Sequence, residues 1–270
     1  MQKRAAVIND FASFGRCSLA VSIPILSAMK IQCCPVPTAI FTNHTGFPSF
    51  KWTDYSAHMD DYIEEWLKLG LKFDAIQTGF LGSVRQIDFV FRFLEAFKSS
   101  RLLVAIDPVM GDYGKLYSTY SMELAESMRR FLPVADILTP NLTEACVLAG
   151  LPYDPAMSNA ALTKVARHLS EPNRAKVVIT GIPRGQNLVN FVYEDGASLV
   201  IETPKLGEDR SGTGDVFSSV VLGAVMNGQS FVNAVDTANL FVAHAVERSI
   251  ALGVPLKDGL AIEEVLGDLT

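Results

Sequence analysis

The stretch DAIQTGFLGSVRQIDFVFRFLEAFKSSRLLVAIDPVMGD, residues 74–112, decides the fold class. Two short apolar runs, 74–78 and 102–106, flank a longer segment over 84–98 whose apolar residues follow a helical pattern. The run at 102–106 is continuously apolar, as in strands that are covered on both faces. The order strand, helix, strand predicts a βαβ unit, which places the two strands parallel in one sheet.

The same alternation extends over the rest of the chain. Further strands are expected at 4–8, 135–138, 176–180, 187–193 and 198–203. Further helices are expected at 16–30, 55–69, 119–131, 143–149, 158–169, 213–227 and 230–251. The two late strands are predicted to form a hairpin across 194–196. Because no linker or repeat interrupts the pattern, we expect one α/β domain over 1–270, a mostly parallel central sheet with helices on both faces.

Composition excludes several classes of protein. The 270 residues include 29 acidic and 23 basic ones, which give a net charge of −6 and argue against a nucleic-acid-binding protein. No segment approaches the roughly 18–20 apolar residues that cross a bilayer, and the apolar start at 5–8 is too short for a signal peptide. The four cysteines form no CxxC pair. We expect a cytoplasmic protein with neither membrane nor nucleic-acid partners.

Polar and glycine-rich residues follow the predicted strands. In sheets of this kind, ligands bind beyond the carboxyl ends of the strands. The segments at these places are Asn9-Asp10, 79–82, 107–112, 139–144 and Thr180-Gly181. We therefore expect a functional site along this edge, with the Asp10 side chain facing the site and not the core.

The segment SGTGD at 211–215 begins a predicted apolar helix. Backbone N–H groups at a helix start have no intrahelical partner and can hold an anion together with the helix dipole. The Asp215 carboxylate lies within the first turn. An anion cradle beside a carboxylate suits phosphoryl transfer to an alcohol, in which the carboxylate accepts the hydroxyl proton. The alternative is a glycine turn with an ordinary acidic residue at a helix start.

Two further acidic segments could hold a nucleotide. DPVMGD at 107–112 places two carboxylates around a turn, an arrangement that can bind Mg²⁺ through waters. TPNLTE at 139–144 leads into another predicted helix. Each has a simpler interpretation, as a turn and as a helix cap with acids in the first turn. The chain contains neither the P-loop pattern nor a strand-linked GxGxxG.

The polar turn Asn43-His44-Thr45-Gly46-Phe47 follows an apolar stretch. Its asparagine, histidine and threonine could hydrogen-bond a small heteroaromatic molecule, against which Phe47 could stack. The simpler interpretation is a solvated loop. His244 lies in an apolar helical pattern and is expected to pack in the core or against another helix.

Together and in this order, these motifs resemble the ribokinase-like superfamily of ATP-dependent small-molecule kinases, and within it the pyridoxal kinases. DPVMGDYG (107–114), TPNLTEA (139–145), ITG (179–181) and SGTGD (211–215) are similar to the nucleotide-binding part of that family's pattern. TNHTGF (42–47) and TGFLGS (78–83) are similar to its substrate-binding part. The resemblance runs from residue 4 to about residue 250.

The resemblance implies a fold, a reaction and residue roles. The reaction is ATP-dependent phosphorylation of the 5′-hydroxymethyl group of pyridoxal, pyridoxamine or pyridoxine. Asp215 would be the general base, with an anion hole of Gly212, Thr213 and Gly214. Mg²⁺ would be bound by Asp107 and Glu144, the ATP phosphates by these two with Asn141, Asp112 and Thr180, and the pyridine ring by Asp10, His44, Thr45 and Phe80. The loop 113–120 would close over ATP. A homodimer and an assisting monovalent cation such as K⁺ are also implied.

Asp10 departs from the family pattern. Pyridoxal kinases carry serine at this position in the segment corresponding to NDFASFG. The related hydroxymethylpyrimidine kinases of thiamine synthesis carry Ser-Asp there, within a glycine-rich SDPSGGAG segment that this chain lacks. Asp10 could contact the substrate or only order its own turn. Hydroxymethylpyrimidine kinase remains an alternative function, and a non-catalytic ligand-binding protein on the same fold is a second one.

Overall fold

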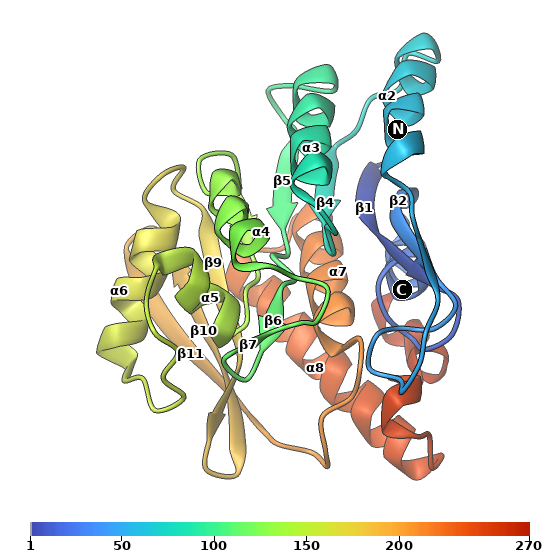
Figure 1. Cartoon of the computed structure of the whole chain (residues 1–270). Coiled ribbons are helices and arrows are strands. Elements are labelled where there is room, and N and C mark those ends of the chain that lie inside the picture. Colours follow the sequence, from blue (N-terminus) through green and yellow to red (C-terminus); the bar gives the residue numbers. More distant parts are fainter. Residues whose placement is uncertain (1) are drawn as a thin grey trace. The chain divides into compact units, whose positions relative to one another are not determined.

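The computed structural model describes residues 2–270. The chain forms two compact units: unit 1 comprises the residues up to Leu102 together with Leu206–Thr270, and unit 2 comprises Leu103–Lys205. Both have the α/β organisation that the sequence predicts (Figure 1). Each unit is described separately below.

Unit 1 contains a four-stranded part of the sheet in the order β4-β1-β2-β3. The strands are β1 (Arg4–Ala12), β2 (Gln32–Phe41), β3 (Trp52–Asp54) and β4 (Ala75–Thr78). β1 pairs in parallel with both β2 and β4, whereas β2 and β3 are antiparallel. All four residues of β4 are buried, as a strand covered on both faces requires.

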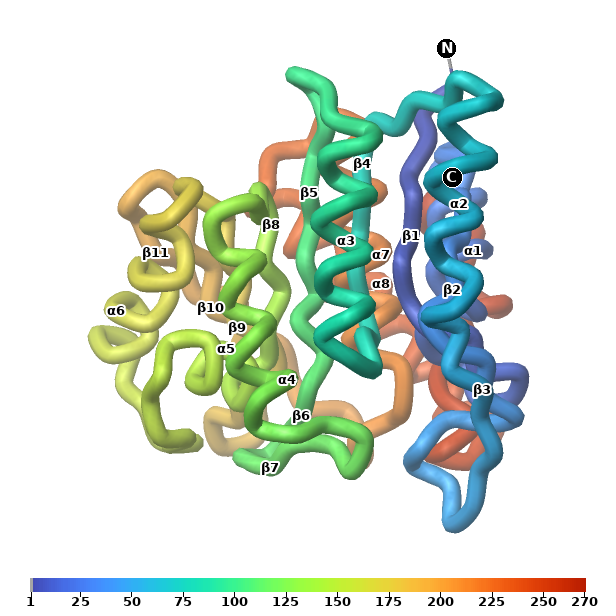
Figure 2. Tube along the Cα trace, turned by 45° about the horizontal axis from the view of Figure 1, so that its top comes forward, coloured from blue at the N-terminus to red at the C-terminus, as the bar shows by residue number. Residues whose placement is uncertain are grey.

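Helices cover both faces of these strands. α2 (Met59–Lys68) and α3 (Val84–Ala96) pack together on one face, while α1 (Leu19–Ala28), α7 (Thr213–Met226) and α8 (Phe231–Ala251) pack on the other (Figure 2). α7 is buried along most of its length, which its nearly continuous apolar sequence predicts. Its N-terminus therefore has a fixed position in unit 1.

Unit 2 carries strands in the order β11-β10-β9-β8-β5. They are β5 (Leu103–Ile106), β8 (Ile137–Leu138), β9 (Lys176–Arg184), β10 (Asn187–Glu194) and β11 (Ala197–Pro204). β5, β8 and β9 are parallel, and the predicted hairpin of β10 and β11 is confirmed. α4 (Met122–Ser127), α5 (Leu142–Ala149) and α6 (Asn159–Ser170) lie on one face (Figure 1), and β6 (Gly111–Asp112) with β7 (Lys115–Leu116) forms a small separate hairpin.

The strand β2 was not among the predicted ones. Its sequence QCCPVPTAIF contains Pro35 and Pro37, and proline is uncommon inside strands because it has no N–H to donate. The outer neighbour β3 pairs only with Ala39–Phe41. The two prolines therefore lie where β3 requires no hydrogen bond from β2.

Two predicted strand ends were wrong. β1 continues to Ala12, so Asn9 and Asp10 lie inside the strand, where the pairing with β2 shifts register between Asn9 and Phe11. Thr180 likewise lies inside β9, which continues to Arg184. Polar residues ended the apolar pattern in the sequence, but irregular pairing lets the strands continue through them.

No helix in the described part of the chain is long and apolar enough to span a membrane.

Candidate active site

Gly212 is the N-cap residue of α7 and has a φ of 78°. Two features disfavour any residue other than glycine at position 212. Its φ is positive, and a Cβ there would lie 1.9 Å from the carbonyl oxygen of Arg16. Thr213 donates its hydroxyl proton to the carbonyl oxygen of Arg210 at 2.8 Å, which fixes the segment that enters the helix. A Cβ at Gly214 would meet no atom within 4 Å. The start of α7 therefore has no space for a side chain at Gly212 and has space for one at Gly214.

Asp215 lies in the first turn of α7. Its Oδ1 accepts a hydrogen bond of 3.1 Å from Nδ2 of Asn9 on β1. Burial raises the pKa of its carboxyl, while the backbone N–H of Ser18 and the side chain of Asn9 act in the opposite direction. Its backbone carbonyl accepts a hydrogen bond from the Ser218 hydroxyl, which in turn accepts one from Gln77 of β4. A buried carboxylate with a raised pKa, held on several sides, is suited to accept a proton.

Asp10 is near Asp215 but does not lie as predicted. It is buried inside β1, with 6% of its surface exposed, rather than on an open edge beyond the strand. Burial raises its pKa to about 7, and the neighbouring charge of Asp215 adds to this, while the Ser18 hydroxyl lowers it. A protonated carboxyl both donates and accepts, as a serine hydroxyl does. Near neutral pH, part of the Asp10 population is therefore protonated and can donate a hydrogen bond as well as accept one.

His44 has both ring nitrogens engaged. Nδ1 accepts a hydrogen bond from the Gly46 N–H at 3.1 Å, so the proton of a neutral ring lies on Nε2, which donates to the carbonyl oxygen of Lys257 at 2.6 Å. The ring also contacts Phe47, with centroids 4.7 Å apart. These contacts leave the ring face, and not its nitrogens, for a ligand. Thr45 is half-buried in the same turn.

Phe80 follows β4 and is also in unit 1. Its backbone N–H donates to Oδ1 of Asn9 at 2.7 Å, and its carbonyl accepts from the Thr38 hydroxyl at 2.8 Å. Its ring packs edge-on against Phe41, with centroids 5.8 Å apart. The predicted residues Asp10, His44, Thr45 and Phe80 therefore lie in the same unit as Asp215.

The second predicted set lies in unit 2, around the start of α5. Asn141 is the N-cap, and its Oδ1 accepts from the Glu144 N–H at 3.0 Å. The buried Glu144 carboxylate accepts from the backbone N–H of Asn141 at 2.8 Å and from that of Met110 at 3.1 Å. Asn141 also donates to the carbonyl oxygen of Gly111. This capping box joins the helix start to the turn 107–112.

The carboxylates of this second set repel one another. The pKa of Glu144 is raised above its ordinary value by burial and, next, by the charge of Asp107. Asp107 is buried, whereas Asp112 is exposed and accepts from the Tyr113 N–H at 2.8 Å. A divalent cation would relieve this repulsion, and carboxylate oxygens are ligands that Mg²⁺ prefers. Thr180 pairs with Asn141 in a parallel bridge, and its N–H donates to the Pro140 carbonyl at 2.9 Å.

The loop 113–120 begins at the hairpin of β6 and β7. The Gly114 N–H donates to the Thr143 hydroxyl at 2.9 Å, which joins the loop to α5. Tyr113 and Tyr117 are exposed, and Tyr120 is buried. The base of the loop is thus fixed beside the second set, while two of its aromatic rings remain accessible.

Two residues of the site were not predicted. Asn9 was noted only as a polar residue after a strand, and Ser18 was unassigned. The hydrogen bond between Asn9 and Asp215 could not be predicted from the sequence, because the two residues are more than two hundred positions apart. A serine before a helix is ordinarily read as a cap, yet Ser18 makes no side-chain cap bond.

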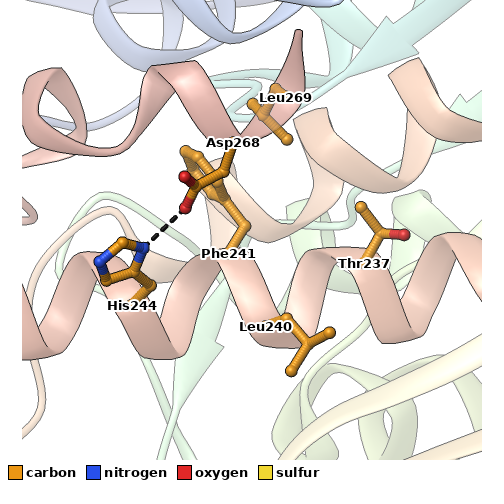
Figure 3. Close-up of a pocket in the computed structure, with 6 residues that line it drawn as sticks. All are labelled: Thr237, Leu240, Phe241, His244, Asp268 and Leu269. Atoms are coloured by element: carbon orange, nitrogen blue, oxygen red, sulfur yellow. Dashed lines mark hydrogen bonds and ion pairs between the residues drawn. The ribbon is translucent and has the colours of Figure 1, made fainter.

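A hollow of about 370 Å³ lies between α8 and the short helix at Leu266–Leu269 (Figure 3). Its lining residues are Thr237, Leu240, Phe241, His244, Asp268 and Leu269. His244 does not lie in the core, because its side chain is 45% exposed. It pairs at 2.6 Å with Asp268 of the short helix, so of the two predicted placements it has the one between helices. None of the predicted site residues lines this hollow.

Comparison with known proteins shows the family to which the chain belongs. Residues 23–258 match the family model described as phosphomethylpyrimidine kinase. A pyridoxine/pyridoxal/pyridoxamine kinase of Bordetella bronchiseptica is 28% identical over 91% of this chain and 89% of its own. A crystal structure from Bacteroides thetaiotaomicron, of a candidate phosphomethylpyrimidine kinase in a form with pyridoxal, matches with a TM-score of 0.96 and 38% identity, covering 100% of this chain and 96% of that one.

A pyridoxal kinase from Leishmania donovani, in complex with ADP and pyridoxamine, has a TM-score of 0.85 and covers 99% of this chain and 95% of its own. At 22% identity, this likeness shows the fold alone.

Proposed function

We propose that this chain is an ATP-dependent kinase of B6 vitamers. It belongs to the phosphomethylpyrimidine kinase family of ribokinase-like proteins. The reaction transfers the γ-phosphate of ATP to the 5′-hydroxymethyl group of pyridoxal, pyridoxamine or pyridoxine. The observation that carries the proposal is the buried Asp215 carboxylate in the first turn of α7, beside the narrow, side-chain-free start of that helix.

The residues of unit 1 supply the acceptor chemistry in this proposal. Asp215 accepts the hydroxyl proton, and its raised pKa brings its proton affinity closer to that of a useful base. The backbone N–H groups of Gly212, Thr213 and Gly214 stabilise negative charge on the phosphoryl group. Asp10 and the ring of Phe80 contact the pyridine ring, with His44 and Thr45 beside it.

The residues of unit 2 supply nucleotide binding in the same proposal. Mg²⁺ is usually held by one or two carboxylates together with substrate phosphates, and Asp107 and Glu144 provide such a pair. Mg²⁺ neutralises charge on the ATP phosphates when it is bound. Asp112 lies in β6, Asn141 caps α5 and Thr180 lies in β9, and in this proposal the three would contact the phosphates. The loop 113–120 would cover the nucleotide, and a monovalent cation such as K⁺ would assist.

Hydroxymethylpyrimidine kinase is the second candidate. The description of the family model favours it, as does the Bacteroides relative's description, although that relative's crystal form contains pyridoxal. Pyridoxal as a ligand of a protein 38% identical to this chain leads us to prefer a B6 vitamer. We further propose that the chain acts as one ribokinase-like domain in a cytoplasmic homodimer.

One assay separates these functions. ATP turnover is measured with pyridoxal, pyridoxamine, pyridoxine and hydroxymethylpyrimidine side by side. The Asp215→Asn variant serves as control, because it keeps the shape of the side chain and loses its proton affinity; its rate should fall by roughly 10²- to 10⁴-fold, with ATP binding nearly unchanged. A preference for hydroxymethylpyrimidine would support the second candidate. Turnover with none of the four would favour the ligand-binding protein.

A further inference from the structure

Asn9 makes three hydrogen bonds at the end of the regular part of β1. Its Oδ1 accepts from the backbone N–H of Asp10 at 2.9 Å and from that of Phe80 at 2.7 Å. Its Nδ2 donates to Oδ1 of Asp215 at 3.1 Å. The two acceptor bonds fix which way the amide faces, because only the oxygen can accept from an N–H. The amide nitrogen is therefore directed at the Asp215 carboxylate.

The surroundings keep Asn9 in this orientation. The residue is buried, with 4% of its surface exposed. A Cβ at Gly79 would lie 2.3 Å from Cγ of Asn9, so the chain has space for the amide only because residue 79 has no side chain. Asn9 thus joins the ends of β1 and β4 to α7, three elements that are far apart in sequence.

We propose that Asn9 is a positioning residue for the phosphoryl transfer, which orients the Asp215 carboxylate and holds it in its ionised form. A donor to a carboxylate favours the charged state, which a general base must have before it can accept a proton. Among the described residues, the titratable groups that interact with this carboxylate include Asp10, Cys17 and His44. The inference rests on the proposed function only where it is tested by reaction rate. Its second test, by stability, does not need the protein to turn over a substrate.

Asn9→Asp separates positioning from a merely structural role. The substitution keeps the acceptor for the N–H groups of Asp10 and Phe80, and it replaces only the donor to Asp215 with a second carboxylate oxygen. Two carboxylates at such a distance do not both ionise and instead share a proton. We expect the acid limb of the kcat profile to move up by at least one pH unit, with kcat near neutral pH at least tenfold lower and KM for ATP little changed.

Asn173→Asp is the matched control. Nδ2 of Asn173 donates to the carbonyl oxygen of Ala135 at 2.8 Å, outside the predicted site, so this variant also loses an amide donor and gains a negative charge. Asn173→Asp should have the same dependence of kcat on pH as the wild type. A pH profile for Asn9→Asp that coincides with those of the wild type and of this control would overturn the proposal. Asn9 would then serve only to connect the ends of β1 and β4.

A second measurement needs no substrate. If the introduced carboxylate and Asp215 share a proton in the folded state, folding of Asn9→Asp takes up more protons than folding of the wild type. Its free energy of unfolding should then fall more steeply as pH rises from about 4 to 8. A parallel pH dependence in the two proteins would overturn the proposal even if no acceptor is turned over. Absent turnover in the wild type alone contradicts only the proposed function.

Discussion

Ser18 precedes α1 with φ 53° and ψ −137°, a conformation that residues with a side chain rarely adopt. It is buried, and its hydroxyl reaches Asp10 while its backbone N–H reaches Asp215. Both Ser18→Ala and Ser18→Gly remove the hydroxyl. Only the glycine variant also removes the backbone strain, so the difference in stability between the two variants reports that strain less the extra entropy that glycine loses on folding.

The expected difference follows from this conformation. A strained backbone of this kind costs on the order of 1–3 kcal/mol. Glycine loses roughly 0.5–1 kcal/mol more than alanine through its freedom in the unfolded chain. Ser18→Gly should therefore be more stable than Ser18→Ala by about 1 kcal/mol, the difference between the middles of these two ranges. In a chain of this length, that is a difference in Tm of about 2–4 °C.

Urea denaturation of both variants tests the prediction, with Ser27 as control. Ser27 is exposed within the same helix, where alanine should exceed glycine by about 1 kcal/mol, the opposite sign. If glycine is no better than alanine at position 18, the backbone there is not strained, and the reasoning fails. Loss of the hydroxyl in either variant should also raise the pKa of Asp10, which the pH dependence of unfolding measures.

Gly212→Ala should abolish turnover and lower stability by at least about 2 kcal/mol, since the added Cβ would meet the Arg16 carbonyl; a refolded variant of normal activity in the vitamer assay would contradict this. Because the pKa of Asp10 is about 7 in the folded state and near 3.9 when unfolded, its contribution to stability is greatest below pH 4 and declines by about 4 kcal/mol as pH rises to 7. Asp10→Asn should flatten that decline in denaturation curves, and an unchanged slope would assign it to another group. Asp107→Ala should need more Mg²⁺ for half-maximal rate while binding vitamer normally, and an unchanged Mg²⁺ titration would make the turn only structural.

The α/β organisation could be predicted from the sequence alone. Continuous apolar runs separated by helical patterns admit few other arrangements, because both faces of such strands must be covered. The segment at 211–215 suited phosphoryl transfer, and those at 107–112 and 139–144 suited a nucleotide with Mg²⁺, but each could equally be a plain turn or helix start. The resemblance to a kinase family, which rests on all these motifs in this order, assigned the individual roles.

How these side chains are held became evident only from the packed fold. Prolines concealed β2, and polar residues concealed the continuation of β1 through Asp10, because irregular pairing depends on the neighbouring strand. Burial, which no sequence pattern measures, raises the pKa of Asp10 to about 7. Asn9 meets Asp215 only because β1 and α7 pack together, and Ser18 adopts a conformation that its residue type disfavours. Contacts between residues distant in the chain, and the burial that these contacts create, are properties of the packed fold and not of any local stretch of sequence.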